Sequence, residues 1–258
     1  RAGMALSMLE CGLLPLSQHA MLFHGRIGYH GTEGFALETD ERQRLVDDLG
    51  NNAIRILRNH GTLVAGSTWP ADERVLLPAY ARLRDDVDAH VRPRLIIAPH
   101  EPTAAHLAPI RDWALSSGLT VATLTEAESD AAAAQRDVIV VDRVGVLGDL
   151  YALANVAFVG GGFHAAGLHS LIEPAAFGAP VLFGPGHDMS REAGLLLAAG
   201  GARVVRDAGE CAAAMGAWLS EPAARAVAGA AARAFVESEL GATERSVRLV
   251  QRLMRERI

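Results

Sequence analysis

The sequence predicts an α/β protein whose larger part is a Rossmann-like, doubly wound parallel sheet. From residue 63 onward, short apolar segments alternate with longer amphipathic segments over most of the 258 residues. The apolar segments, such as residues 94–98 and 156–159, lack the polar alternation of half-exposed strands, which is typical of parallel strands covered on both faces. Two of these segments end in glycine, at Gly66 and Gly160. Because such sheets bind ligands beyond the carboxyl ends of their strands, these glycines also indicate where a site lies.

The first 62 residues have a less regular pattern and predict a small α/β fragment. The expected elements are helices at residues 2–11 and 40–49 and strands at residues 20–23 and 53–57. Glu41 lies in the first turn of the second helix, where the helix dipole favours an acid, and Gly50 follows its last turn. We place the domain boundary so that residues 1–63 form the first domain and residues 64–258 the second.

From residue 63 the expected elements follow one another with short connections. The strands are expected at residues 63–66, 94–98, 119–124, 138–141, 156–159, 180–183 and 202–205. The helices are expected at residues 70–88, 103–117, 146–154, 169–177 and 191–199, and three alanine-rich helices end the chain. Strands and helices that alternate in this way place helices on both faces of one sheet.

The composition excludes several chemistries. All 24 residues counted as Lys or Arg are Arg, so the chain offers no lysine for a Schiff base, for pyridoxal phosphate or for a P-loop. The formal net charge is −6, and no basic field exists that would hold nucleic acid. No apolar run reaches the roughly 18 residues of a membrane span, so we expect a cytoplasmic protein without a transmembrane segment. Cys11 and Cys211 form neither a disulfide framework nor a metal-ligand spacing.

The stretch from residue 156 to residue 185 is the most informative for function. An apolar strand leads into Gly160-Gly161-Gly162, and a helix is expected from His169, with Ser170 near its start and Glu173 one turn later. Glycine lets a ligand approach the backbone, and free N–H groups at a helix start bind phosphate or carboxylate. Glu173 would accept a hydrogen bond from a sugar hydroxyl of a nucleotide. The alternative interpretation is a tight glycine turn followed by a helix that Ser170 caps.

A series of motifs in residues 64–258 has a distinctive order and spacing. They are Gly66-Ser67-Thr68, Ala98-Pro99-His100-Glu101-Pro102, Gly148-Asp149-Leu150-Tyr151-Ala152-Leu153-Ala154, Phe158-Val159-Gly160-Gly161-Gly162, Gly167-Leu168-His169-Ser170, Glu173-Pro174-Ala175, Phe183-Gly184-Pro185, Gly200-Gly201-Ala202 and Gly241-Ala242-Thr243-Glu244-Arg245. In these motifs the chain resembles the C-terminal half of bacterial 3-deoxy-D-manno-octulosonic acid (Kdo) transferases. The resemblance covers about three quarters of the chain.

The resemblance implies the donor-binding half of a GT-B glycosyltransferase. The donor-binding residues that it implies are Gly66, Ser67, His100, Gly160, Gly161, Gly162, Gly167, His169, Ser170 and Glu173. Many family members have Arg where this chain has His100, and Gly-Gly-His-Asn where it has Gly167-Leu168-His169-Ser170. Asp188 would repel a bound phosphate, so we expect Arg191 rather than Asp188 to contact the donor.

The resemblance also implies a reaction, the transfer of Kdo from CMP-Kdo to a lipid A precursor in lipopolysaccharide biosynthesis, without a metal or other cofactor. The expected partners are CMP-Kdo or CMP, and the lipid A precursor if an acceptor half is supplied. The family's catalytic base lies in its N-terminal half, so we expect no catalytic residue here and no activity from this chain alone. A peripheral position at the inner face of the inner membrane is expected. The amphipathic, Arg-rich residues 221–258 would pack across both halves, and their exposed face predicts self-association.

Residues 1–62 carry a second set of motifs. They are Cys11-Gly12-Leu13-Leu14-Pro15-Leu16-Ser17-Gln18, Arg26-Ile27-Gly28-Tyr29-His30, Glu33-Gly34, Asp40-Glu41-Arg42, Leu49-Gly50 and Leu57-Arg58-Asn59-His60-Gly61. In these the chain resembles the class II aldolase/adducin family, in which the His of Arg-Asn-His-Gly is a zinc ligand. His60 would then be the remnant of an incomplete zinc site, because the family's His-x-His pair would precede Arg1, which we interpret as a cut end. Zinc is therefore not expected to bind here.

Two other hypotheses remain beside the donor half of a Kdo transferase. The first is a fragment of a class II aldolase/adducin-type enzyme with zinc-dependent carbonyl or aldol chemistry. The second is a non-catalytic binding module built on the Rossmann-like part. Both families have an apolar strand that ends in glycine at residues 63–66, so we interpret the chain as a fusion at this shared segment, either natural or from misassembled sequence.

Overall fold

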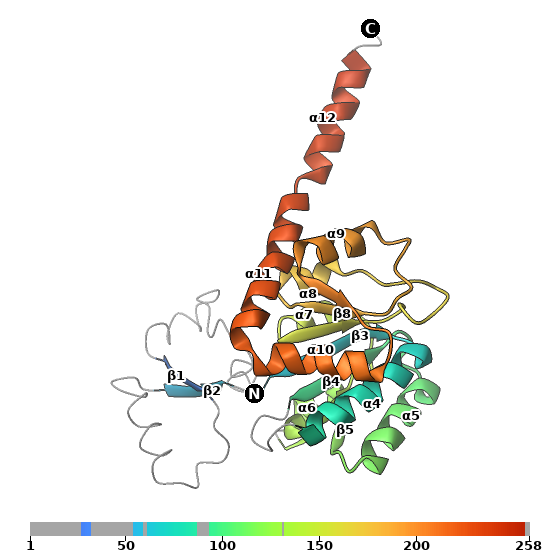
Figure 1. Cartoon of the computed structure of the whole chain (residues 1–258), viewed down its shortest axis with the longest axis vertical. Helices are drawn as coiled ribbons and strands as arrows, with labels where there is room; N and C mark the ends of the chain where they lie inside the picture. The colour runs from blue at the N-terminus through green and yellow to red at the C-terminus, as the bar shows by residue number, and fades with distance from the viewer. Residues whose placement is uncertain (1–26, 32–53, 59–60, 87–92, 131, 256–258) are drawn as a thin grey trace.

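The structure is a computed structural model that describes residues 27–31, 54–58, 61–86, 93–130 and 132–255 (Figure 1). His60, the helices expected at residues 2–11 and 40–49, and the strand expected at residues 20–23 lie outside the described residues. Two strands, β1 (Ile27–Gly31) and β2 (Ile54–Arg58), pair in parallel with each other, and β2 lies one residue later than expected. No helix in the described part of the chain is long and apolar enough to cross a membrane.

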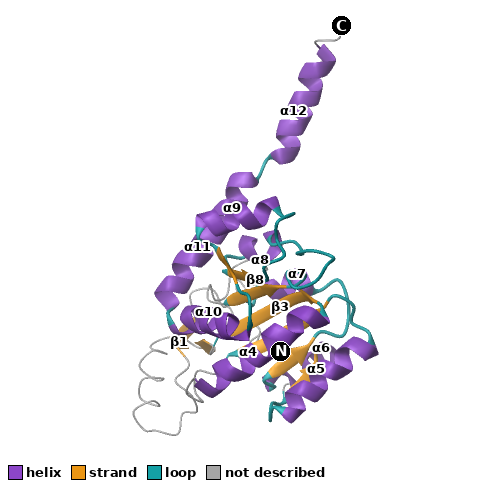
Figure 2. Ribbon diagram, turned by 45° about the vertical axis from the view of Figure 1, so that its right-hand side comes forward, coloured by secondary structure: helices purple, strands orange, loops and turns teal. Residues whose placement is uncertain are grey.

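A seven-stranded parallel sheet forms the centre of the larger part (Figure 2). Its strands are β3 (Thr62–Thr68), β4 (Arg94–Pro99), β5 (Val121–Thr123), β6 (Val138–Val140), β7 (Val156–Val159), β8 (Val181–Phe183) and β9 (Ala202–Val204). They lie in the order β5-β6-β4-β3-β7-β8-β9, and every neighbouring pair is parallel. The predicted fold class is confirmed.

Helices cover both faces of this sheet. They are α4 (Pro70–Asp86), α5 (Ala104–Ser116), α6 (Leu124–Ser129), α7 (Leu147–Tyr151), α8 (Ile172–Ala176), α9 (Arg191–Ala199), α10 (Ala208–Ser220), α11 (Pro222–Glu239) and α12 (Ala242–Arg255). Within β3, Leu63 packs in the core formed with α4, α5 and α10, whereas its neighbour Val64 packs on the other face with α7. Because successive side chains point to opposite faces, a strand buried on both sides must be apolar at every position.

The strand order reverses between β3 and β7. Along the chain β3 is the first strand of the sheet, and it pairs with β4 on one side and with β7 on the other. The chain therefore builds β4, β5 and β6 on one side of β3 before it crosses to build β7, β8 and β9 on the other. The segments that follow β3 and β7 consequently lie at the topological switch point, where open parallel sheets bind ligands.

Two helices of the second half of the sheet compare differently with the expected elements: α9 agrees with them, whereas α8 does not. α9 begins and ends as expected, because Ser190 accepts a hydrogen bond from the Ala193 N–H at its start and Gly200, with a φ of 81°, follows its end. α8, in contrast, begins at Ile172 and not at His169, and it has only 5 residues. Leu171 is its N-cap residue, and the hydroxyl of the preceding Ser170 accepts a hydrogen bond from the Ile172 N–H at 3.3 Å.

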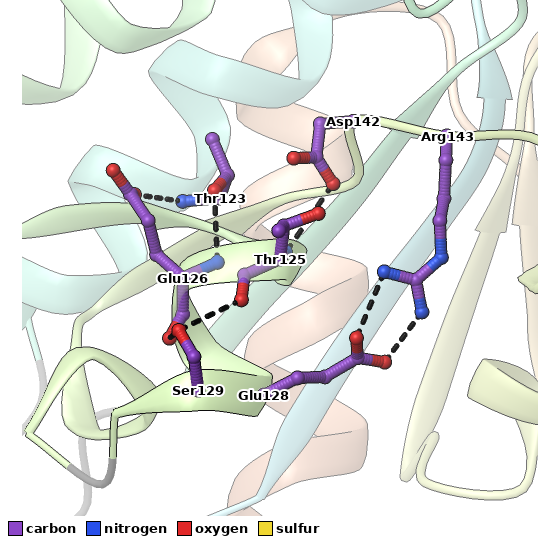
Figure 3. A network of polar contacts seen from close by, with 7 residues as sticks. All are labelled: Thr123, Thr125, Glu126, Glu128, Ser129, Asp142 and Arg143. Carbon is purple, nitrogen blue, oxygen red and sulfur yellow. Dashed lines mark hydrogen bonds and ion pairs between the residues drawn. The ribbon is translucent and has the colours of Figure 1, made fainter.

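α6 is absent from the expected elements, although its sequence contains a start signal. The Thr123 hydroxyl accepts from the Glu126 N–H and the Glu126 carboxylate accepts from the Thr123 N–H, which is a complete capping box (Figure 3). A bidentate ion pair between Arg143 and Glu128 also connects α6 to the segment that follows β6. Both groups are solvent-exposed, so this ion pair adds little stability.

α12 points away from the sheet in both views (Figures 1 and 2). Val247, Val250 and Met254 are 49%, 54% and 65% exposed. They are three to four residues apart and therefore share one face of the helix. An apolar face of this kind favours association with another surface, and the expected self-association stays a prediction.

Candidate functional site

Three strand ends meet at the switch point and are joined through their backbones. β3 continues through Ser67, β4 leads into His100, and β7 leads into Gly160. The Gly160 N–H donates to the Gly66 carbonyl at 2.9 Å, and the His100 N–H donates to the Thr68 carbonyl at 2.9 Å. Ser67 has a φ of 53°, in the left-handed region that residues other than glycine rarely adopt. Such backbone strain is found mainly where it serves a site.

The glycines after β7 allow these backbones to approach one another. A Cβ atom on Gly160 would lie 2.2 Å from the Ser67 carbonyl oxygen, and one on Gly162 would lie 2.5 Å from the Gly184 nitrogen. Gly161 has a φ of 94°, and a Cβ there would meet the Gly167 carbonyl oxygen at 2.1 Å. Any side chain at these three positions would push the loops apart, so the glycines are required by the local packing. At Gly66 the neighbouring atom is not backbone but the side-chain hydroxyl of Tyr151.

Asp72, in the first turn of α4, holds the glycine turn in place. Its side chain is fully buried. One carboxylate oxygen accepts from the N–H groups of Trp69 at 2.9 Å and Gly161 at 2.8 Å, and the other accepts from the Phe163 N–H at 3.1 Å. These three charge-assisted hydrogen bonds satisfy the buried carboxylate and connect the start of α4 to the loop after β7.

Trp69 stacks with histidines from the other two segments. Its ring lies 4.3 Å from His164 at an interplanar angle of 6°, and 4.5 Å from His100 at 26°. His100 in turn stacks on His169 at 4.6 Å, and the indole Nε1–H donates to His169 Nε2 at 3.2 Å. We call Trp69, His100, His164 and His169 the aromatic cluster. It joins the ends of β3, β4 and β7 in one row of rings.

Two of these histidines use a ring nitrogen as a hydrogen-bond acceptor. His169 uses Nε2 to accept from Trp69, so its neutral ring carries the proton on Nδ1. Burial lowers the pKa of His169, His100 and His164 lower it further, and the negative charge of Asp72 partly opposes them. His164 uses Nδ1 to accept from the Ala166 N–H at 3.1 Å. Protonation of either acceptor nitrogen would break a hydrogen bond.

Glu73, next to Asp72, lies below the loop that follows β3. Its carboxylate accepts from the Thr68 hydroxyl at 2.9 Å. Burial raises the pKa of Glu73, the hydrogen bond from Thr68 lowers it, and the nearby charge of Asp72 raises it again. The balance leaves the pKa above its ordinary value, so the site contains one carboxyl group that takes up a proton more readily than usual.

Three other predicted donor-binding residues, Gly167, Ser170 and Glu173, lie on the segment from the glycine turn to the first turn of α8. Ser170 and His169 line a cavity of about 260 Å³, together with Leu168, Leu171, Ile172, Met189, Ser190 and Glu192. Glu173 is exposed at the start of α8. Burial of Tyr151 raises the pKa of its hydroxyl, and the negative charge of Glu173 raises it further. Gly167 has a φ of 89° with no atom close to where a Cβ would stand.

Arg191 is directed to a different partner. Its guanidinium Nη1 lies 3.2 Å from the Glu239 carboxylate on α11, and its side chain is 71% exposed. The structure thus brings Gly66, Ser67, His100, Gly160, Gly161, Gly162 and His169 together, with Gly167, Ser170 and Glu173 close along the chain. A contact between Arg191 and the donor would require this ion pair to open, and that contact stays a prediction.

Three residues of the site are not among the donor-binding residues that the sequence predicts. Trp69, Asp72 and His164 act through contacts with residues 89 to 100 positions away or through ring stacking, neither of which leaves a local pattern. The only sequence signal is the acidic pair Asp72 and Glu73 directly after a strand end. Among the described residues no group of three or more His, Cys, Asp or Glu side chains could hold a metal ion, and His60 lies outside them.

Comparison with known proteins separates the chain into two parts. Residues 1–71 match the family described as Class II Aldolase and Adducin N-terminal domain. A Caulobacter vibrioides protein described as aldolase class 2 is 48% identical over 66 residues, which are 26% of each chain. The predicted similarity of the N-terminal part to this family is confirmed.

The larger part is similar to Kdo transferases. The 3-deoxy-D-manno-octulosonic acid transferase of Chlamydophila psittaci is 34% identical over 139 residues, 54% of this chain and 30% of that protein. The C-terminal CMP-Kdo binding domain of WaaA from Acinetobacter baumannii superimposes with a TM-score of 0.59 at 23% identity, covering 68% of this chain and 89% of that domain. The predicted similarity to this family and the fold of a GT-B half are confirmed. The chain spans less than a third of the length of these curated relatives.

Proposed function

We propose that the sheet domain binds the donor nucleotide CMP-Kdo, or CMP, at the ends of β3, β4 and β7. The domain would then act as the donor half of a glycosyltransferase that transfers Kdo to a lipid A precursor. The main support is the set of loops that meet at the switch point, where open parallel sheets bind ligands. The likeness to Kdo transferases and to a CMP-Kdo binding domain supports CMP-Kdo as the donor.

The site contains groups for each part of such a ligand. The close packing of Gly160, Gly161 and Gly162 against the neighbouring loops fixes the backbone at the strand ends, where we propose that the phosphate binds. The rings of the aromatic cluster offer π faces and N–H donors to a base or an anion. Glu173 is exposed and can accept from a ribose hydroxyl. We propose that this binding uses neither a metal nor another cofactor.

We also propose that residues 1–258 alone transfer no sugar. Residues 1–71 match a different family, so the surface that would hold the acceptor has to come from another polypeptide segment. An acceptor anchored in lipid would bring the assembled enzyme to the inner face of the inner membrane. Incubation with CMP-Kdo and a lipid A precursor should therefore yield no product above background, and Kdo transfer by this chain alone would contradict the proposal.

Isothermal titration calorimetry tests the binding proposal. CMP titrated into the protein at pH 7.5 should bind with one site, and AMP should bind more weakly, because the proposed donor carries cytosine. A Gly160→Ala variant should lose the interaction, because the new Cβ would displace the Ser67 carbonyl. Equal heats for CMP and AMP, or no heat at millimolar CMP, would remove the support for a cytidine nucleotide site.

The alternative function is a fragment of a class II aldolase/adducin-type, zinc-dependent carbonyl or aldol enzyme. The match of residues 1–71 to that family favours it. The described residues supply no set of three ligands that fits zinc, so we derive no reaction step from a metal. Metal analysis of the purified protein tests this alternative, and a stoichiometric zinc that is lost in a His60→Ala variant would support it.

A further inference from the structure

The loops at the switch point contain no permanent positive charge. The four loops are residues 66–73, 99–103, 160–170 and 184–190, and none of them contains Lys or Arg. Their carboxylates are Asp72, Glu73, Glu101 and Asp188, and their histidines are His100, His164, His169 and His187. With all four histidines neutral, these loops would repel a phosphate. Arg74 and Arg191 directly follow two of these loops, and within the loops themselves only a histidine can supply a positive charge.

Of the arginines near this edge, Arg74 at the start of α4 is exposed, and three others are paired. Arg143, Arg191 and Arg206 each pair with a glutamate: Glu128, Glu239 and Glu210. The first N–H groups of the long helix α4 lie beside Asp72, whose carboxylate already accepts from Trp69. α8 has only 5 residues and offers little dipole. Beside these arginines, the histidines of the aromatic cluster are the groups at the strand ends that can gain a positive charge when an anion binds.

Within the aromatic cluster His100 differs from the other two histidines. His164 and His169 each use a ring nitrogen to accept a hydrogen bond, which protonation would break. In the described part of the chain, the ring nitrogens of His100 make no hydrogen bond to protein, and the residue is exposed. Its ring lies on the face of Trp69 at 4.5 Å, where an imidazolium is stabilised by a cation–π interaction. Its backbone is fixed by the bond to the Thr68 carbonyl.

We propose that His100 is the titratable cation of this site, and that a bound nucleotide phosphodiester places a proton on its imidazole. The proton comes from solvent and forms a new N–H bond on the ring, and no other bond changes. The indole face of Trp69 stabilises the resulting imidazolium, which then donates to the anion. The inference rests on the proposed nucleotide site and adds to it a coupling between ligand binding and proton uptake.

Acidic and basic groups flank His100. Asp72 and Glu73 lie at the start of α4, and Glu101 follows on its own loop. His164 and His169 lie on the loop after β7, and His106 lies on α5. An anion that binds the protonated ring must raise its proton affinity, so affinity for the anion increases as pH falls.

The experiment is a pH series of calorimetric titrations with the methyl ester of CMP. This phosphodiester keeps one negative charge between pH 6 and pH 8, whereas CMP has a second phosphate pKa of about 6 and would add its own titration. For the wild type, Kd should rise with pH by up to about tenfold per unit, the limit for one proton. Titrations at one pH in buffers of different ionisation enthalpy should show the uptake of up to one proton.

Three variants assign the proton. His100→Arg carries a permanent charge and should bind at all pH values with no proton uptake, whereas His100→Gln should bind weakly at all pH values. His106→Gln is the matched control, because His106 bonds to the Glu101 carbonyl outside the aromatic cluster, and it should keep the wild-type pH dependence. A pH-independent Kd in the wild type, or proton uptake that persists in His100→Arg, would overturn this inference while leaving the nucleotide site intact. No binding at any pH would overturn both.

Discussion

The carboxylate of Asp72 accepts a hydrogen bond from the backbone N–H of Gly161 at 2.8 Å, across 89 residues of sequence. This contact joins the helix after the first strand of the sheet to the glycine turn after the fifth. The same carboxylate also accepts from Trp69, so the aromatic cluster and the glycine turn share one buried anchor. The geometry of the site therefore depends on an acid that would not itself touch a ligand.

Asp72→Asn should weaken both stability and nucleotide binding. The amide keeps one acceptor oxygen but places an NH₂ group opposite the N–H that the second oxygen accepted. A buried donor without an acceptor costs about 1–3 kcal/mol in the free energy of unfolding. Urea denaturation and CMP titration measure the two effects. Asp85→Asn, at an exposed position on the same helix, is the control and should change neither.

Replacing Gly160 and Gly194 with alanine should change the free energy of unfolding in opposite directions. At Gly160 the new Cβ would lie 2.2 Å from the Ser67 carbonyl oxygen, so Gly160→Ala should lower the free energy of unfolding by about 1–3 kcal/mol. Gly194 lies inside α9 with no atom within 4 Å of a Cβ, so Gly194→Ala should raise it by about 0.5–1 kcal/mol. Thermal and urea denaturation of both variants provide the comparison. Equal effects at the two positions would mean that the loops are not in close contact.

Trp69→Phe should raise the pKa of His169. The phenyl ring preserves stacking but cannot donate a hydrogen bond to Nε2, so this nitrogen becomes available to a proton. An NMR titration of the His169 ring protons between pH 5 and pH 8 measures the change. Trp113→Phe is the matched control, because that ring contacts Tyr80 edge-on at 6.3 Å, away from the aromatic cluster. An unchanged pKa in Trp69→Phe would show that the Trp69–His169 hydrogen bond does not form in solution.

Glu73→Gln should stabilise the protein at neutral pH but not at acidic pH. Burial, the largest effect, raises the pKa of Glu73, so the folded state favours the neutral acid. The wild type therefore loses stability as pH rises from the unfolded value of about 4.3 through the raised folded value. Glutamine still accepts from the Thr68 hydroxyl and carries no charge. Urea denaturation of both proteins at pH 4, 5.5 and 7 should show a growing advantage for the variant, and a constant difference would contradict the shifted pKa.

The sheet was predictable because burial on both faces makes its strands unbroken apolar runs. α9 was predictable because Ser190 and Gly200 mark its ends. The start of α8 was not, because the His169 N–H donates to the Gly160 carbonyl at 3.1 Å, and that long-range contact holds the chain in a loop. α6 could have been found from Thr123 and Glu126, which form a capping box at the standard spacing.

The glycines of the site were predictable from their place at strand ends, and the roles of Trp69, Asp72 and His164 were not. A tryptophan or an aspartate after a strand is common, and only the folded sheet brings these side chains to the loop after β7. The same is true of His100, whose difference from the other histidines lies in the hydrogen bonds that it does not make within the described chain. The sequence motifs predicted at which edge of the sheet the site lies. Only the structure shows which charged and aromatic side chains meet there.

A two-dimensional ¹H–¹⁵N NMR titration with CMP locates the nucleotide site on the sheet. At saturating CMP, the largest amide shifts should fall at Ser67, His100 and Gly160–Gly162, on three separate strand ends that meet at the switch point. Amides on the opposite edge of the sheet, such as that of Asn155 before β7, should remain unchanged. Shifts confined to residues 1–58, or spread evenly over the sheet, would contradict a nucleotide site at this edge.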